Sequence, residues 1–252
     1  MRYAVIGGTN IETPPIPYRE EAISTPYGDV VLFRGKMPNG HEIIFRTRHG
    51  VLNPHDPGQI NYRANAFALD KIGVSNVIGI TSVGACDFSY KLGTLCLLTD
   101  FMDFTKARPV SFDREYRRFV HTGMEEVFNP VMNDRLEKLI GEMGIPYSGR
   151  AIYACTEGPR FETAAEIRAL RMLGAQVTGM TVVPEAPLFA ELGIKYASIG
   201  IISNRCTGMT SYVTDEEIGV VMAGIRHNVF ELCFEFIGRE MERFEKEQGG
   251  GL

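Results

Sequence analysis

The stretch Tyr153-Ala-Cys-Thr-Glu-Gly-Pro-Arg-Phe-Glu-Thr-Ala-Ala-Glu166 organises this chain. It starts with apolar residues typical of a strand and breaks at Gly158-Pro159. Thr163 and Glu166 then follow with the spacing of a helix-capping pair. We therefore expect a strand, a turn and the start of a helix.

The turn itself carries an aromatic residue, Phe161, next to a carboxylate, Glu162. Such a pair can stack on a flat heterocycle and accept a hydrogen bond from an N–H group on its edge. The alternative interpretation is a core phenylalanine beside a solvated glutamate that the helix dipole favours. The rest of the chain decides between these two interpretations.

Composition limits the classes of partner. The chain has 252 residues, of which 44% are hydrophobic, and this is enough for the core of one large α/β domain spanning residues 1–252. A formal charge of −5 and a pI near 5.6 argue against a broad nucleic-acid surface, so any phosphate site must be local. The five cysteines are scattered and never form a CxxC pair, which indicates reduced thiols.

The N-terminus runs directly into a strand, without the basic segment and the long apolar run of a signal peptide or a membrane span. We therefore expect a cytoplasmic protein that does not contact a membrane.

Apolar runs and periodicity predict the other elements. We expect strands at 3–6, 29–33, 42–47, 74–80, 95–98 and 196–202, a strand or strand end at 177–183, and helices at 60–71, 133–143, 163–173 and 214–247. A further helix is predicted to start within 179–185, with Pro184 and Glu185 near its first turn. The proline-rich segment 14–26 is predicted to be an irregular loop. Segment 100–118 is predicted to be a loop-rich excursion that contacts a partner subunit.

Polar residues recur where the predicted strands end, which is where α/β sheets place ligand groups. Donors at Thr9, Arg48, His49, Thr181 and the Ser82 amide make a set of the size of a phosphate. Phe161, Glu162 and Asn204 suit a planar nitrogenous base instead. For Arg48 and His49, the alternative is a surface arginine beside a turn histidine.

Other chemistries lack their motifs. The Gly7-Gly8-Thr9-Asn10 turn is not a GxGxxG fingerprint and lacks the lysine of a P-loop. The five histidines and five cysteines show no metal-ligand spacing, and a serine hydrolase would need a GxSxG elbow. We therefore expect no metal, and neither a dinucleotide nor a nucleoside triphosphate as cofactor.

Six separated motifs, GGTN, RHG, NYRAN, CTEGPRFET, GMTVVPE and YASI, occur in this order along almost the whole chain. Together they resemble the trimeric purine nucleoside phosphorylase family, specifically its methylthioadenosine/methylthioinosine phosphorylase branch. The resemblance implies an α/β fold with a mixed, distorted central sheet flanked by helices. It also implies inorganic phosphate as co-substrate, a purine nucleoside as substrate, and a homotrimer or a dimer of trimers.

Site roles follow from the same resemblance. It assigns phosphate binding to Thr9, Arg48, His49, Ser82 and Thr181. Met180 matches the residue that contacts the ribose, Phe161 the ring that stacks on the base, and Asn204 the residue that contacts purine N7. His121 matches a histidine that the adjacent subunit contributes to the site. Asn204 and His49 are the candidate catalytic residues. A donor that binds N7 as negative charge develops on the leaving purine acts in the transition state.

The chain departs from the adenosine-type pattern of this family. Methylthioadenosine phosphorylases have Asp in place of Asn204, a second Asp near Cys206, and Ser in place of Glu162. Asn can donate to O6, and Glu can accept from the N1–H found only in 6-oxopurines. The sequence therefore favours a 6-oxopurine substrate, with a methylthioadenosine phosphorylase as the alternative. Asn53 and Asn10 also differ, since the family more often has His and Gly there.

Two further classes remain open. One is a nucleosidase that uses water in place of phosphate, which phosphate dependence distinguishes. The other is a silent purine-binding module, against which Arg48, Thr181 and Asn204 argue together because such a module needs none of them. The 5′ preference, hydroxyl or methylthio, is left open.

Overall fold

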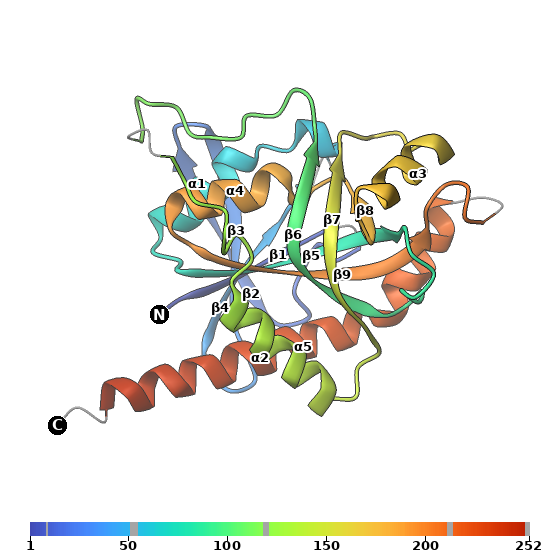
Figure 1. The fold of residues 1–252 in the computed structure, drawn as a ribbon. Coiled ribbons are helices and arrows are strands. Elements are labelled where there is room, and N and C mark those ends of the chain that lie inside the picture. Colours follow the sequence, from blue (N-terminus) through green and yellow to red (C-terminus); the bar gives the residue numbers. More distant parts are fainter. Residues whose placement is uncertain (9, 51–54, 118–120, 211–213, 250–252) are drawn as a thin grey trace.

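A mixed β-sheet forms the centre of the protein (Figure 1). The computed structural model describes residues 1–8, 10–50, 55–117, 121–210 and 214–249. In these ranges the strands are β1 (Tyr3–Gly7), β2 (Tyr18–Thr25), β3 (Gly28–Lys36), β4 (Glu42–Thr47), β5 (Asn76–Ala85), β6 (Leu95–Phe104), β7 (Tyr147–Thr156), β8 (Val177–Gly179) and β9 (Lys195–Arg205). Their order across the sheet is β2-β3-β4-β1-β5-β8-β7-β6-β9.

The sheet closes on itself at one end. Strand β5 pairs with β9 as well as with β1 and β8, so β5, β8, β7, β6 and β9 form a ring. Pairs β1/β4, β1/β5, β5/β9, β6/β7 and β7/β8 are parallel, whereas β2/β3, β3/β4, β5/β8 and β6/β9 are antiparallel. The predicted fold class, α/β with a mixed and distorted sheet, is confirmed.

Helices cover both faces of this sheet. In Figure 1, α1 (Tyr62–Lys71) and α4 (Val182–Leu192) lie above it, and α2 (Pro130–Glu142) and α5 (Asp215–Gly249) lie below. Each face has its own apolar core: one includes Leu69 and Phe189, and the other includes Phe45 and Phe230. Helix α3 (Ala164–Met172) lies beside β8, and the short 3₁₀ helix η1 (Pro57–Gln59) precedes α1.

The organising stretch folds as predicted. Thr163 caps α3: its hydroxyl accepts from the Glu166 amide, and the Glu166 carboxylate accepts from the Thr163 amide. Gly158 has a φ of 66°, a left-handed value that disfavours other residues, and Gly174 follows α3 with a φ of 101°. Turn and cap together fix the segment between β7 and α3.

Predictions about two irregular segments and about the ends of two strands were wrong in part. Segment 14–26 contains β2, whose largely exposed, polar residues suit the edge of the sheet. Segment 100–118 is regular up to Phe104, because β6 continues along β7. Strand β5 does not stop before Thr81, and β9 runs through Asn204, because these two strands pair along their whole length.

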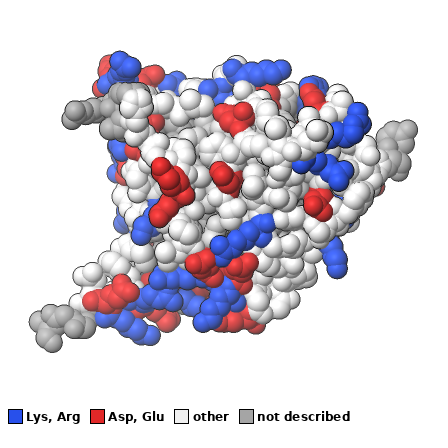
Figure 2. All heavy atoms as spheres, viewed as in Figure 1, with Lys and Arg blue, Asp and Glu red and all other residues white. Residues whose placement is uncertain are grey.

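The face shown in Figure 2 mixes charges of both signs. Along α2 and α5, Arg239 pairs with Glu142 and Arg243 pairs with Glu240. This mixing leaves no broad basic surface on that face. Among the residues that the structure describes, no helix is both long enough and apolar enough to span a bilayer.

Candidate active site

A cavity of about 200 Å³ opens where several strands end or pass. It is lined by Gly8, Arg48, His49, Pro57, Thr81, Ser82, Gly84, Pro159, Phe161, Glu162, Thr178, Gly179, Met180, Thr181, Asn204 and Ile218. The sheet brings these residues together because the parallel strands β1, β4, β5 and β9 direct their carboxyl ends to the same edge. Sequence-predicted residues from five separate segments therefore meet in one place.

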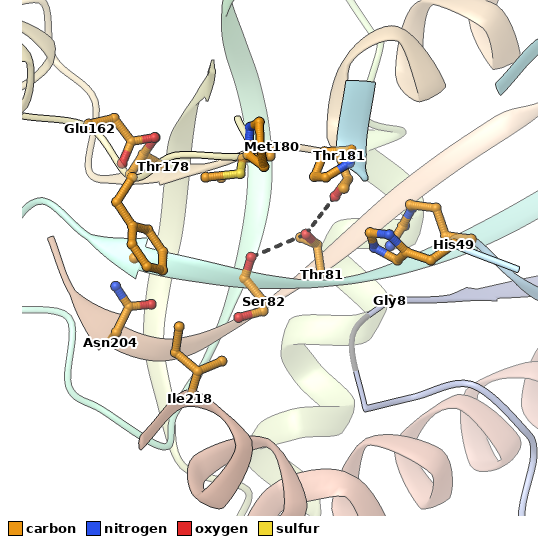
Figure 3. A pocket seen from close by; sticks show the side chains of 16 residues that line it. Gly8, His49, Thr81, Ser82, Glu162, Thr178, Met180, Thr181, Asn204 and Ile218 are labelled. Atoms are coloured by element: carbon orange, nitrogen blue, oxygen red, sulfur yellow. Dashed lines mark hydrogen bonds between the residues drawn. The ribbon is translucent and has the colours of Figure 1, made fainter. Parts of the chain in front are cut away.

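The cavity has two chemically different ends. In Figure 3, Glu162 and Asn204 lie at one end and His49 and Thr181 at the other. Ser82 and Met180 lie between them. We call these the carboxylate end and the cation end. Thr9, assigned to the cation end from the sequence, lies outside the described residues, as does Asn53.

Arg48 is the cation of the cation end, and its side chain is fully buried. Its Nε and Nη2 donate to the two oxygens of Glu185, at 2.7 and 2.9 Å, and its Nη1 donates to the Ile80 carbonyl at 2.7 Å. Counted over the residues that the structure describes, three of the five guanidinium N–H donors are engaged, which leaves two for a ligand. Gly8 permits this arrangement, since a Cβ there would lie 2.9 Å from Nη1.

Glu185 was missed by the sequence analysis, which treated it only as part of a helix start. It is 3% exposed and also accepts from the Tyr196 hydroxyl at 2.6 Å. Burial alone would lower the pKa of Arg48, but the charge and hydrogen bonds of Glu185 raise it above its ordinary value. The signal that could have identified it is a single carboxylate within the otherwise apolar stretch 182–190.

His49 lies beside Arg48 with a defined proton position. Its Nδ1 is 2.9 Å from the carbonyl oxygen of His55, and a carbonyl only accepts, so Nδ1 carries the hydrogen. Burial is the largest cause that lowers the pKa of His49, with the nearby Arg48 charge adding to it. The neutral imidazole therefore has an acceptor, Nε2, on its other side.

Hydroxyl groups complete the cation end. Thr81 Oγ1 and Thr181 Oγ1 lie 3.1 Å apart, and the Thr181 hydroxyl makes no capping bond to the helix that follows. The Thr181 amide donates to the Tyr153 hydroxyl at 3.3 Å.

Asn10, in the turn after β1, has a φ of 62°. This left-handed value suits glycine, and asparagine also adopts it, which explains how Asn10 replaces the glycine usual there.

Arg108, which the sequence analysis also missed, binds the backbone that carries the cavity residues Met180 and Thr181. Its guanidinium donates to the carbonyl oxygens of Met180 at 2.6 Å and Val183 at 2.8 Å, and pairs with Glu157 at 3.1 Å. It thereby fixes the turn that presents Met180 and Thr181. A buried arginine within a loop gives no local sequence signal.

Two threonine hydroxyls lie beside Glu162 at the carboxylate end. Thr156 donates to Oε1 of Glu162 at 2.5 Å. The Thr178 hydroxyl lies 3.3 Å from the same oxygen and 3.0 Å from the Ala154 carbonyl, which is its nearer acceptor. Glu162 is 6% exposed, and its second oxygen, Oε2, is available to accept an N–H from a ligand. Phe161 is 39% exposed and lines the same end.

Asn204 faces Glu162 across the carboxylate end (Figure 3). Its Nδ2 donates to the Arg205 carbonyl at 3.0 Å, and its Oδ1 accepts from the Ser203 hydroxyl at 2.8 Å. One N–H of the amide is left for a ligand. The Asn204 donor and the Glu162 acceptor thus lie at the same end of the cavity.

His121 is exposed and does not line this cavity. Its assignment to the site of an adjacent subunit stays a prediction. Within the described residues, no group of three His, Cys, Asp or Glu side chains could hold a metal ion. All five cysteines are free thiols, as the sequence predicted, and all five are buried.

Comparison with known proteins places the chain among nucleoside phosphorylase relatives. A family model described as the phosphorylase superfamily matches residues 2–237. The chain is 42% identical over 231 residues to a probable 6-oxopurine nucleoside phosphorylase of Thermococcus kodakarensis, covering 88% of this chain and 86% of that protein. It is 38% identical over 238 residues to a probable S-methyl-5′-thioinosine phosphorylase of Methanopyrus kandleri, covering 92% and 91%.

Solved structures extend the comparison to the fold. The methylthioadenosine phosphorylase of Schistosoma mansoni in complex with tubercidin is similar, with a TM-score of 0.88 over 96% of this chain and 92% of that chain. The sequence identity is 23%, so this likeness supports the fold alone.

Proposed function

The chain belongs to the phosphorylase superfamily, and from this premise we propose that it is a purine nucleoside phosphorylase that favours 6-oxopurines. It uses inorganic phosphate to cleave the glycosidic bond, releasing the free base and a ribose 1-phosphate or its 5-methylthio derivative. The observation that carries the proposal is that Glu162, an acceptor, and Asn204, a donor, lie together at the carboxylate end.

This pairing matches the edge of a 6-oxopurine. Glu162 Oε2 accepts from N1–H, which adenine lacks, and the remaining Asn204 N–H donates to N7 or O6. Adenine would instead set the lone pair of N1 against the carboxylate. A buried acceptor left unpaired costs about 1–3 kcal/mol, enough for a tenfold bias between substrates.

The cation end holds phosphate in the proposed mechanism. Arg48 donates its two remaining N–H groups, and the hydroxyl of Thr181 and the amide of Ser82 add neutral donors. Neutral His49 accepts the O–H of monohydrogen phosphate through Nε2. Phosphate then attacks C1′ while the ribose carries positive charge, and Met180 contacts the sugar between the two ends.

The leaving purine gains negative charge as its bond to C1′ breaks. Asn204 meets this charge with an N–H directed at N7, which stabilises the transition state more than the ground state. Phe161 stacks on the base. No cofactor takes part in this proposal.

A coupled assay tests the proposal with inosine, guanosine, adenosine, methylthioinosine and methylthioadenosine, each with and without phosphate. We expect turnover of the 6-oxopurine nucleosides only when phosphate is present. Undiminished base release in phosphate-free buffer would instead identify a nucleosidase. A preference for methylthioadenosine over every 6-oxopurine would refute the base assignment.

We further propose that the protein is a cytoplasmic homotrimer, or a dimer of trimers, in which His121 reaches the nucleoside of a neighbour. Support comes from the resemblance at His121 and from residues 105–117, which lack helices and strands and include the exposed Val110 and Tyr116. Light scattering measures the assembly. A fully active monomer would exclude a shared site.

A further inference from the structure

Strand β9 carries a β-bulge where it passes the cavity. In the ladder with β5, Ile202 pairs with Val83 and Asn204 pairs with Gly84, so Ser203 is an extra residue without a partner in the register. Consecutive side chains of a regular strand point to opposite faces, and a bulge re-aims them. The Asn204 amide thus packs against β5, with Nδ2 only 3.1 Å from where a Cβ of Gly84 would be.

Counting hydrogens fixes the direction of the Asn204 amide. The Arg205 carbonyl, 3.0 Å away, can only accept, so the nitrogen of the amide lies on that side and Oδ1 faces Ser203. The Ser203 hydroxyl lies 2.8 Å from this Oδ1 and 3.3 Å from the Val83 carbonyl. Its single proton therefore goes to the nearer acceptor, Asn204.

Ser82 continues this chain of hydrogen bonds into the cavity. Its Oγ lies 2.6 Å from the Ser203 Oγ, and because the Ser203 proton is already used, Ser82 is the donor. Ser82 lies between the two ends of the cavity (Figure 3). The chain runs from Ser82 through the buried Ser203, which is 1% exposed, to the Asn204 oxygen.

We propose that Ser203 is a positioning residue that locks the Asn204 amide with an N–H directed at N7 of the leaving purine. This inference rests on the proposed function. Without the Ser203 hydroxyl, a half-turn of the amide would present its oxygen to N7, where negative charge develops. Ser203 does not line the cavity, so it acts only through Asn204 and Ser82.

Steady-state kinetics of Ser203→Ala, Ser203→Thr and the control Ser198→Ala test the proposal. Ser198 is a fully buried serine on the same strand, β9. It pairs with Gly79 of β5, five residues before Ser203, and does not line the cavity. We expect Ser203→Ala to lower kcat on inosine about tenfold, the order of effect expected for one misdirected hydrogen bond to a charged group. Ser203→Thr keeps the hydroxyl and should retain most of kcat, and Ser198→Ala should retain it within about twofold.

The substrate 7-methylinosine separates positioning from a general structural effect. Its N7 carries a methyl group and a positive charge, so the base leaves neutral and needs no N–H at N7. Wild type and Ser203→Ala should therefore cleave it at similar rates. Melting temperatures of all variants identify any that unfold.

Three outcomes would overturn the inference: an unchanged kcat of Ser203→Ala on inosine, an equal loss on both substrates, or a Ser203→Thr variant as slow as Ser203→Ala. The proposed function fails separately, if wild-type protein cleaves no purine nucleoside in the presence of phosphate. Wild-type cleavage combined with an unaffected Ser203→Ala variant refutes the positioning role alone.

Discussion

Replacing Arg48 by methionine tests both the ion pair and the phosphate site. The substitution leaves Glu185, 3% exposed, without the guanidinium that binds both of its oxygens. Within the described part of the chain, the Tyr196 hydroxyl is then its one remaining donor. Breaking a buried ion pair by removing one partner costs about 3–5 kcal/mol. Since about 1 kcal/mol shifts the melting temperature of a chain this size by roughly 2–4 °C, we expect a drop of roughly 6–20 °C.

A double variant, Arg48→Met with Glu185→Gln, separates stability from phosphate binding. The glutamine keeps an oxygen that can accept from Tyr196 and removes the unpaired charge, so most of the lost stability should return. Phosphate binding should not return with it. Loss of a charge-assisted contact costs about 1.5–3 kcal/mol, so the KM for phosphate should rise roughly 10- to 150-fold while that for the nucleoside changes little.

The assay combines thermal unfolding with initial rates over a range of phosphate concentrations. Glu185→Gln alone serves as the matched control, since it removes the carboxylate and keeps the guanidinium. A double variant with the phosphate KM of the wild type would show that Arg48 does not bind phosphate. An Arg48→Met variant with the same melting temperature as the wild type would contradict a stabilising buried ion pair.

Three further predictions concern the histidine, the base and the helix cap. Because burial lowers the pKa of His49, Nε2 should become protonated, and so stop accepting, only below the ordinary pKa of about 6.5. We therefore expect kcat/KM for phosphate to decrease as the pH is lowered below that value. The His49→Gln variant should not show this decrease. Activity that rises on acidification would show that His49 acts as a cation. Asn204→Asp should mainly lose inosine cleavage, whereas Asn204→Asp with Glu162→Ser should gain measurable adenosine cleavage; a single variant that prefers adenosine would refute the role of Glu162. Thr163→Ala should cost about 1 kcal/mol, or roughly 2–4 °C in melting temperature, because it removes one half of the capping box. Calorimetry showing no shift would mean that the cap contributes nothing.

Local sequence signals predicted the framework of the site well. The cap at Thr163 and Glu166 depends on residues three positions apart, and the polar groups near the strand ends depend on the common direction of parallel strands. For this reason Arg48, Thr181 and Asn204, which the sequence assigns to separate strand ends, line the same cavity. Edge strand β2 was not predicted, because its exposed polar residues lack the apolar alternation of a buried strand.

Long-range partners gave no such signal. Glu185 is 137 positions from Arg48, and Ser203 is 121 positions from Ser82, so only the pairing of distant strands and helices makes them neighbours. The bulge at Ser203 has the same origin, since it is defined by the register of β9 against β5. Thr156 and Thr178, whose hydroxyls lie beside Glu162, likewise come from separate strands, β7 and β8.

The salt bridge between Arg48 and Glu185 bears on how phosphate arrives at the site. Among the described residues that line the cavity, Arg48 is the only Lys or Arg, and the carboxylate of Glu185 cancels its charge beyond contact range. Glu162 adds a negative charge at the other end, so the cavity does not project a positive field into solvent. Ionic strength should therefore have little effect on the association rate of phosphate. In the proposed phosphorolysis, phosphate reaches the cavity by diffusion and is retained by short-range donors, so selection depends on the shape of the ion and not on its charge alone.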